Sequence, residues 1–277
     1  MAITRTLALL LAISLLAGCS WLSSKDKGEE SRNWSASKFY AEASTAMKER
    51  DFERAIEYYE KLEARYPFGR YATQAQLDVA YAYYQYDEPE SALAALDRFI
   101  KLHPRHSHVD YAYYLKGIVN FNRSIGFIDR FLPTDVSQRD AGAAMDAFDD
   151  FSELVRKFPQ SKYSVDARKR LLYLRNNIAR HELHVARYYM DRGAYLAAAN
   201  RGIYVVENYQ RAPAVRDALK IMAEAYDKLG LEELSADARR VLALNEKQGK
   251  FDYLDEAEAA SKPLGRKVWE YLELDEN

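Results

Sequence analysis

The histidines of this sequence are the first candidates for metal chemistry, but their spacing is poorly suited to it. His103, His106 and His108 cluster just after a predicted helix, and we interpret them as a polar turn between repeats. His181 and His184 lie three residues apart, whereas the zinc-binding His-Glu-x-x-His pattern places its two ligands four apart. We therefore predict no metal site.

The carboxylate pairs are equally unsuited to acid–base catalysis. Asp149–Asp150 and Asp255–Glu256 are adjacent residues, and adjacent positions on a helix point to different sides. The sequence also lacks a phosphate-binding Gly-x-x-x-x-Gly-Lys loop, a Gly-x-Ser-x-Gly elbow and a cysteine nucleophile. We therefore predict no catalytic residues, no soluble cofactor and no enzymatic activity.

Cys19 is the single cysteine, and the residues before it indicate export. Arg5 is followed by the apolar run Leu7–Leu16 and then by the small pair Ala17-Gly18, which is the order of a secretory signal peptide. The run is far too short to span a membrane, which takes about 20 apolar residues. Residues 1–18 are therefore predicted to be removed as a signal peptide.

The segment Leu16-Ala17-Gly18-Cys19 resembles the bacterial lipobox. This resemblance implies cleavage before Cys19, a diacylglycerol thioether on its sulfur and acylation of the new amino group, so that the protein is held on a membrane by its lipid. Ser20 follows the cysteine, and by analogy with lipoprotein sorting a serine there implies export to the outer membrane. Residues 19–37 are polar, and we interpret them as the lipidated terminus and a flexible spacer.

The composition limits the remaining functions. The chain has 40 basic and 42 acidic residues and a formal net charge of -2, which argues against a nucleic-acid partner. A lone cysteine can form no internal disulfide, so the fold must be stabilised by packing. About 240 residues follow the anchor and its spacer, which is enough for a sizeable core.

An internal repeat organises these residues. Proline ends the triplets at Pro67, Pro104 and Pro159. An alanine lies twelve residues before each of these prolines, and a large apolar residue lies five before it. A fourth copy keeps this pattern, and a weaker fifth copy has a leucine in place of the alanine. In chain order the pairs are Ala55 and Leu62, Ala92 and Phe99, Ala147 and Leu154, Ala198 and Val205, Leu234 and Val241. The spacing places each pair on one helical face.

A second helix is predicted before each of these, so the repeat unit is a helical hairpin. The first two units are 37 residues apart, close to the ~34 residues of a tetratricopeptide repeat. We predict an all-α fold of about five such hairpins, stacked in a right-handed superhelical solenoid over residues 38–250. The expected units are 38–70, 71–107, 108–162, 163–212 and 213–248.

Two parts lie outside this pattern. Residues 120–140 are expected as an insertion between the two helices of the third unit. Residues 251–277 form an acidic tail with Trp269 and Tyr271 near its end, where one extra amphipathic helix is possible. Neither feature has a role that the sequence assigns.

Tyrosine is abundant, with 22 residues, and several lie on the predicted first helices of the hairpins. About half of them are expected to serve packing alone. The others cannot all face the core, because neighbours on a helix diverge by about 100°. Since first helices line the inner groove of tetratricopeptide proteins, these tyrosines predict a groove that binds a peptide.

From Cys19 to about Gln248 the chain resembles the BamD family, the lipoprotein subunits of the β-barrel assembly machinery of Gram-negative outer membranes. Several segments carry the resemblance in order. They are Arg65-Tyr66-Pro67-Phe68-Gly69, Gln76-Leu77-Asp78, Tyr81-Ala82-Tyr83-Tyr84, Asp97-Arg98-Phe99-Ile100, Asp110-Tyr111, Arg139-Asp140, 148–158, Arg168-Lys169-Arg170-Leu171, Tyr188-Tyr189, Arg192-Gly193-Ala194 and Asn200-Arg201. The departures are residues 125–136, Tyr209-Gln210 in place of a proline, and the tail after Gly249.

The resemblance implies a non-enzymatic scaffold with two binding regions, anchored on the periplasmic face of the outer membrane. Its amino-terminal repeats would recognise the targeting strand of unfolded barrel precursors, which ends in an aromatic residue. On this chain the precursor-binding residues would be Tyr66, Phe68, Tyr71, Asp78, Tyr81, Tyr84, Tyr111 and Tyr114.

The carboxy-terminal repeats would dock a BamA-like barrel subunit through its POTRA domain. The interface residues would be Tyr188, Tyr189, Arg192, Asn200 and Arg201. Arg201 could pair bidentately with a partner carboxylate or be an ordinary solvated charge. The family also implies contact with other Bam lipoproteins, which we do not assign to residues.

Two other classes of function stay open at this point. One is a periplasmic tetratricopeptide lipoprotein that coordinates peptidoglycan or other envelope enzymes. The other is an envelope enzyme with a helical solenoid, which would need a catalytic module that the repeats leave little room for.

Overall fold

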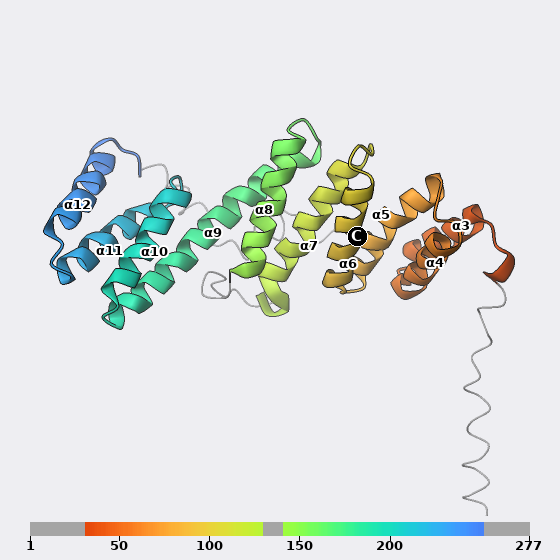
Figure 1. Ribbon diagram of the computed structural model, residues 1–277, viewed down its shortest axis with the longest axis horizontal. Coiled ribbons are helices and arrows are strands. Elements are labelled where there is room, and N and C mark those ends of the chain that lie inside the picture. The colour runs from red at the N-terminus through yellow and green to blue at the C-terminus, as the bar shows by residue number, and fades with distance from the viewer. Residues whose placement is uncertain (1–30, 130–140, 252–277) are drawn as a thin grey trace, which may run out of the picture. The chain divides into compact units, whose positions relative to one another are not determined.

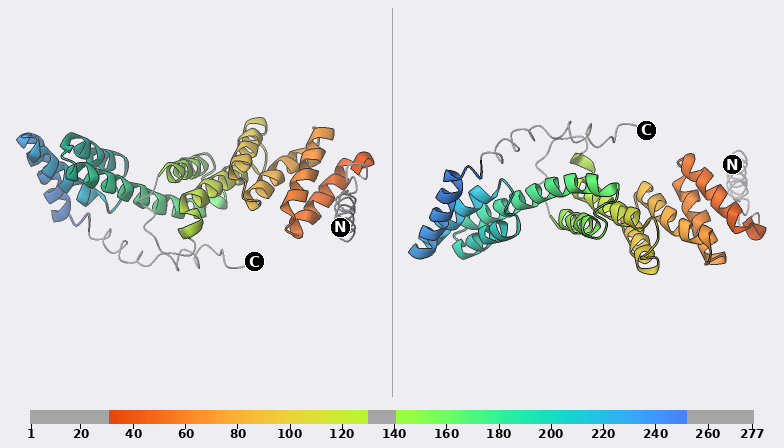
Figure 2. Two further views of the ribbon diagram at one scale, coloured as in Figure 1. Left: turned by 90° about the horizontal axis from the view of Figure 1, so that it is seen from below. Right: turned by 90° about the horizontal axis from the view of Figure 1, so that it is seen from above.

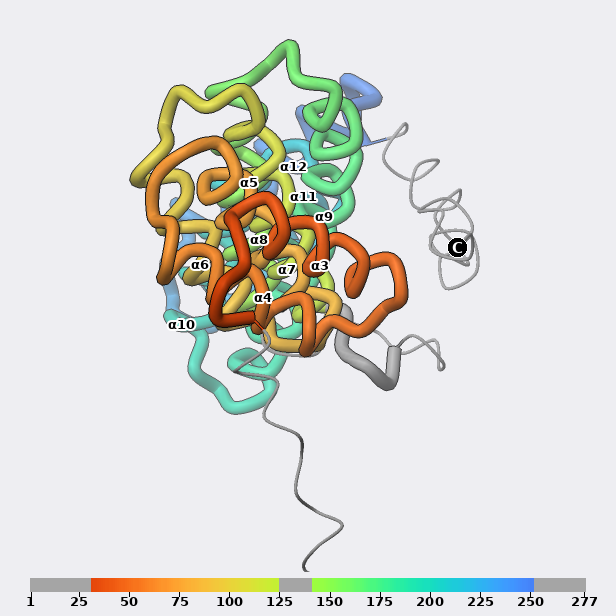
Figure 3. The backbone as a smooth tube through the Cα atoms, turned by 90° about the vertical axis from the view of Figure 1, so that its right-hand side faces the viewer, coloured from red at the N-terminus to blue at the C-terminus, as the bar shows by residue number. Residues whose placement is uncertain are grey.

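The computed structural model describes residues 31–129 and 141–251, apart from the side chains of 125–129. Every regular element in these ranges is a helix (Figure 1; Figure 3). After the short 3₁₀ helix η2 (Ser31–Asn33) come α3 (Ala36–Lys48), α4 (Phe52–Arg65), α5 (Arg70–Gln85), α6 (Pro89–Leu102), α7 (Val109–Asp129), α8 (Gly142–Lys157), α9 (Tyr163–Asp191), α10 (Tyr195–Asn208), α11 (Val215–Lys228) and α12 (Glu232–Lys247). The prediction of an all-α protein of about five helix pairs is confirmed, and the handedness of their stacking stays a prediction.

The chain divides into two compact units, one ending at Ala82 and one beginning at Tyr83. Cys19, residues 130–140 of the predicted insertion and residues 252–277 of the tail lie outside the described residues. The structure therefore leaves the lipid anchor and the extra tail helix as predictions.

The repeat positions explain the core. All eight alanine and large apolar positions of the first four copies, from Ala55 to Val205, are 0% exposed. The alanines allow close approach of a neighbouring helix, and the large residues fill the space beside them. In the fifth copy, by contrast, Leu234 and Val241 are 46% and 38% exposed.

In the first unit α3 packs against α4 around Phe39, Tyr59 and Leu62. The residues just before α3 also belong to this unit. Ser31 is buried, Arg65 donates hydrogen bonds to the carbonyls of Ser31 and Arg32, and Trp34 packs against Phe39 at a ring distance of 5.2 Å. The predicted spacer boundary at residue 37 is therefore too late, because the segment from Ser31 onward packs on the first hairpin.

In the second unit α9 is the central element. It has 29 residues and packs against α7, α8, α10 and α11 (Figure 2). Its inner face buries Leu174, Ile178 and Leu183. The prediction of one long helix from Ser164 to about Met190 is confirmed to within a residue at each end.

The predicted insertion begins later than expected. Helix α7 continues through Asn120 to Asp129, because Asn120 is a buried side chain whose amide donates to Asp150 of α8 over 2.8 Å. Lys116, one turn earlier, bridges Asp97 of α6 at 2.9 Å and Asp150 at 3.2 Å. Asp150 is buried and Asp149 exposed, so this carboxylate pair does diverge as predicted.

Candidate functional site

Five of the eight predicted precursor-binding residues lie in the first unit: Tyr66, Phe68, Tyr71, Asp78 and Tyr81. The first three occupy the turn between α4 and α5 and the start of α5. Phe68 is 91% exposed, and Gly69 beside it has φ 105°, a value that favours glycine. The turn therefore displays one aromatic ring on a backbone of fixed conformation.

Asp78, another predicted precursor-binding residue of the first unit, forms hydrogen bonds within that unit. Asp78 accepts hydrogen bonds from the Tyr40 hydroxyl at 2.7 Å and from the Gln74 amide at 2.8 Å. Burial and the bond to Asp78 raise the pKa of Tyr40 well above its usual range. The Tyr40 ring also lies 5.6 Å from that of Tyr71. Asp78 therefore joins α3 to α5.

The hydroxyl of Tyr66 is also used within the unit, since it donates to the carbonyl of Trp34 at 2.8 Å. Tyr81 is 37% exposed on α5. Among the described residues of this unit, Phe68 and Tyr81 are thus the ones whose rings offer most surface to a ligand.

The other three predicted precursor-binding residues, Tyr84, Tyr111 and Tyr114, lie in the second unit. Tyr114 stacks on Tyr163 at 4.9 Å and an interplanar angle of 21°, and the Tyr111 ring also lies 5.5 Å from that of Tyr163. Sequence reasoning missed Tyr163, which begins α9 and joins the three rings into one aromatic cluster. Tyr84 accepts a hydrogen bond from the Asn122 amide of α7.

Next to this cluster is an ion pair that the sequence reasoning did not predict. The Tyr114 hydroxyl donates to Asp166 at 2.8 Å, and Arg170 donates to the same carboxylate oxygen at 2.5 Å. Arg170 is 8% exposed and its guanidinium lies 4.8 Å from the Phe121 ring centre. Burial raises the pKa of Tyr114 to about 12, with Arg170 opposing the shift and Asp166 adding to it. The i, i+4 spacing of Asp166 and Arg170 was the available signal.

These contacts share one pattern. Tyr40 of α3 bonds to Asp78 of α5, Tyr84 of α5 to Asn122 of α7, and Tyr114 of α7 to Asp166 of α9. Each joins the first helices of two consecutive pairs. Tyr84 and Tyr114, two of the tyrosines expected to bind a ligand, therefore also join neighbouring first helices.

The predicted barrel-subunit interface lies at the junction of α9 and α10. Tyr188 is 54% exposed, and the Arg192 guanidinium lies 5.2 Å from its ring centre. Tyr189 packs beside Tyr188 at 5.8 Å. Asn200 is exposed on α10. The exposed residues form a patch with an aromatic ring and a cation side by side.

Arg201 is not simply a solvated charge. Its Nη1 donates to the Glu182 carboxylate at 2.9 Å, where the Arg201 side chain is 43% exposed and that of Glu182 only 6%. This hydrogen bond raises the pKa of the guanidinium. A partner carboxylate would therefore meet an Arg201 whose position Glu182 already fixes.

The other predicted chemistry can be checked only over the described ranges. There, no group of three His, Cys, Asp or Glu side chains is arranged to hold a metal ion. The rings of His103 and His106 pack on Phe99 at 5.2 and 5.3 Å, as suits a turn between repeats. Among the same residues, none of the helices combines the length and apolar character needed to cross a bilayer.

A helical-repeat protein with aromatic and charged surfaces on two separate units is the class that these observations define. Residues 32–242 match the family described as YfiO, outer membrane lipoprotein, and the chain belongs to this family. Curated relatives carry the name outer membrane protein assembly factor BamD. That of Neisseria meningitidis serogroup A is 45% identical over 241 residues, covering 86% of this chain and 90% of the relative. That of Vibrio cholerae is 37% identical, covering 87% and 98%.

Similar solved structures are more distant. They include the TPR2AB domain of yeast Sti1 in its pHSP90 complex, at 15% identity, with 85% of this chain and 95% of that chain covered and a TM-score of 0.37. A crystal structure of MamA matches at 17% identity, with 79% and 94% covered and a TM-score of 0.33.

Proposed function

We propose that this chain is a non-enzymatic scaffold of the outer-membrane β-barrel assembly complex. It binds unfolded barrel precursors with its amino-terminal repeats and a BamA-like barrel subunit with its carboxy-terminal repeats, and so assists folding and insertion. The observation that carries this proposal is the extent of the family match, which runs through the helical repeats rather than through one motif. Depletion of the protein, followed by measurement of barrel proteins in the outer membrane, tests it. Unchanged barrel levels would contradict the proposal.

The scaffold is held on the periplasmic face of the outer membrane by lipid on Cys19, with other Bam lipoproteins on its flanks. Replacing Cys19 with alanine should abolish incorporation of labelled palmitate and move the protein out of the outer-membrane fraction. Ser20→Asp, which leaves Cys19 in place, is the matched variant: it should keep the label but change the membrane in which the protein is found. Retention of Cys19→Ala in the outer membrane would overturn the anchor.

Precursor binding is assigned to exposed aromatic rings rather than to the engaged hydroxyls. Phe68 is 91% exposed and contributes little to the core, so Phe68→Ala should leave the fold intact and weaken binding of a peptide that ends in an aromatic residue. A loss of severalfold is expected for one aromatic contact at an exposed site. Leu102→Ala is the matched control, because Leu102 is 57% exposed at the end of α6 and outside the predicted set. Equal affinities of the two variants would contradict the assignment.

Barrel-subunit binding is tested at Arg192 rather than at Arg201. Arg201→Glu would place two carboxylates together at buried Glu182, and so would perturb the fold as well as the surface. Arg192→Glu reverses a charge that lies over exposed Tyr188 and should reduce co-purification of the barrel subunit from solubilised membranes. Arg240→Glu on α12 is the control, since its side chain is 75% exposed. Recovery of murein enzymes alone with the unmodified protein would favour a role in coordinating envelope enzymes instead.

A further inference from the structure

The last helix pair breaks the burial pattern of the repeat. In the first four copies the alanine and large apolar positions are 0% exposed, whereas their counterparts Leu234 and Val241 on α12 are 46% and 38% exposed. The reason is positional. Helix α10 is covered by α9 before it and α11 after it, while α12 packs against α11 and no helix follows it in the described residues.

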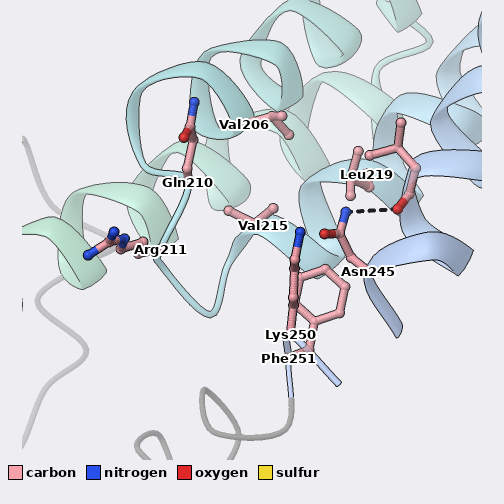
Figure 4. A pocket seen from close by; sticks show the side chains of 9 residues that line it. Val206, Gln210, Arg211, Val215, Leu219, Asn245, Lys250 and Phe251 are labelled. Carbon is pink, nitrogen blue, oxygen red and sulfur yellow. Dashed lines mark hydrogen bonds between the residues drawn. The ribbon is translucent and has the colours of Figure 1, made fainter. Parts of the chain in front are cut away.

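The uncovered face of α12 borders a cavity of about 410 Å³, which we call the terminal cavity (Figure 4). Val206 and Gln210 come from α10 and the turn after it, Val215 and Leu219 from α11, and Val241 and Asn245 from α12; Arg211, Lys250 and Phe251 complete the lining. Four of these nine residues are aliphatic and one is aromatic, and Arg211 and Lys250 bring positive charge to the rim. A stack of repeats needs its terminal apolar face covered, so the cavity should have an occupant.

The chain itself leaves from this cavity. Phe251 is 4% exposed, with the Arg216 guanidinium 5.1 Å from its ring centre, so the start of the tail is fixed against the cavity wall. Residues 252–263 can reach about 40 Å when extended, which is long enough for residues 264–277 to return to the cavity. A segment tethered so closely has an effective concentration in the millimolar range.

The sequence of the tail complements the cavity. Leu264, Val268, Tyr271 and Leu272 are spaced as one face of a helix. The tail also carries eight acidic and three basic residues, which suits the basic rim at Arg211 and Lys250.

We propose that residues 264–274 dock on the terminal cavity as a further helix, which covers Leu234 and Val241 as a following first helix covers the earlier repeats. The tail is thus the cap of the helical repeat rather than a free extension. This inference concerns the end of the fold and does not depend on the proposed function.

Hydrogen exchange of the purified full chain tests the docking. Residues 264–274 should exchange at least about tenfold more slowly than an unstructured segment. Val241→Glu, which places a negative charge in the cavity, should return them to unprotected rates. Leu244→Glu is the matched control: Leu244 is 53% exposed on the same helix but does not line the cavity, so the tail should stay protected. Exchange in α9, which does not line the cavity, and circular dichroism should be unchanged in both variants.

Three results would overturn the proposal. The first is an unprotected tail in the unmodified chain. The second is equal loss of protection in Val241→Glu and Leu244→Glu, which would place the tail elsewhere. The third is protection that rises with protein concentration, which would make a second copy of the chain the occupant. Removal of residues 252–277 provides the converse measurement, because residues 206–219 should then exchange faster.

Discussion

Each unit of the molecule holds a tyrosine hydroxyl against an aspartate, and the two sites differ in what else the aspartate binds. In the first unit Asp78 receives the Tyr40 hydroxyl and the neutral Gln74 amide. In the second unit Asp166 receives the Tyr114 hydroxyl and the guanidinium of Arg170. Both bonds join the first helices of successive pairs, but only at Asp166 do these bonds include a nearly buried cation, since Arg170 is 8% exposed.

This difference separates two uses of the same bond. At Asp78 two neutral donors, the Tyr40 hydroxyl and the Gln74 amide, bond to a half-buried carboxylate. Either donor can be lost without leaving a charge in the core. At Asp166 the carboxylate balances a cation that lies against Phe121 and Phe151. A buried cation without its partner is costly, so Asp166 should be the less replaceable of the two.

The largest expected effect comes from removing the aspartates. Asp166→Ala should lower the free energy of unfolding of α9 by about 3 kcal/mol, because it leaves the Arg170 charge unpaired. Asp78→Ala should cost about 1 kcal/mol in α5, as expected for lost hydrogen bonds. Hydrogen exchange of the amides of each helix gives the two opening free energies separately. Asp166→Asn, which keeps an acceptor for Tyr114, is the control for shape, and equal costs at Asp78 and Asp166 would remove the distinction between the two sites.

Removing the tyrosine hydroxyls should reverse the order of the two sites, so that the larger loss of stability falls in the first unit. Tyr114→Phe leaves Asp166 bound to Arg170, so its cost should be near the low end for a hydrogen bond, about 0.5 kcal/mol. Tyr40→Phe leaves Asp78 with the weaker Gln74 amide and should cost about 1 kcal/mol, most of the cost of Asp78→Ala. The same exchange measurement checks both variants. A larger loss for Tyr114→Phe than for Tyr40→Phe would mean that the hydroxyl, and not the guanidinium, dominates at Asp166.

The sequence was enough to place the core of these units and not enough to find their polar contacts. The seven-residue spacing of pairs such as Ala147 and Leu154 identified buried positions, because helical periodicity is local. The bond from Tyr114 to Asp166 joins residues 52 apart, and that from Arg201 to Glu182 joins residues 19 apart. Such pairings depend on which helix faces come together, and no local pattern specifies that.

The insertion is an instructive intermediate case. The greater length of the third unit predicts an insertion that begins at Asn120, yet α7 continues to Asp129. No proline or other strong helix breaker occurs between Asn120 and Pro133 apart from Gly126, so the local signal favoured a continuing helix. The point where the insertion in the repeat is predicted to begin and the point where the helix ends are separate properties. Here they are Asn120 and Asp129, about two and a half helical turns apart.

The smallest expected effect is the alkaline loss of stability that the tyrosines cause. Burial raises the pKa of Tyr114 to about 12 in the folded chain, against about 10 in the unfolded chain. The folded state thus holds its proton more tightly, so the stabilising contribution is complete below pH 10 and is lost as the pH rises from 10 through about 12. Since Tyr114 is only partly buried, we expect solvent to limit this loss to about 1 kcal/mol. In Tyr114→Phe the fall in the α9 opening free energy over this range should be shallower by that amount. Burial raises the pKa of Tyr59 in the first unit to about 12 as well. Helix α4 should therefore weaken over the same pH range in the unmodified chain and in Tyr114→Phe, which makes it the internal control. If the pH dependence of the α9 opening free energy were unchanged by Tyr114→Phe, Asp166 and Arg170 alone would govern the second unit.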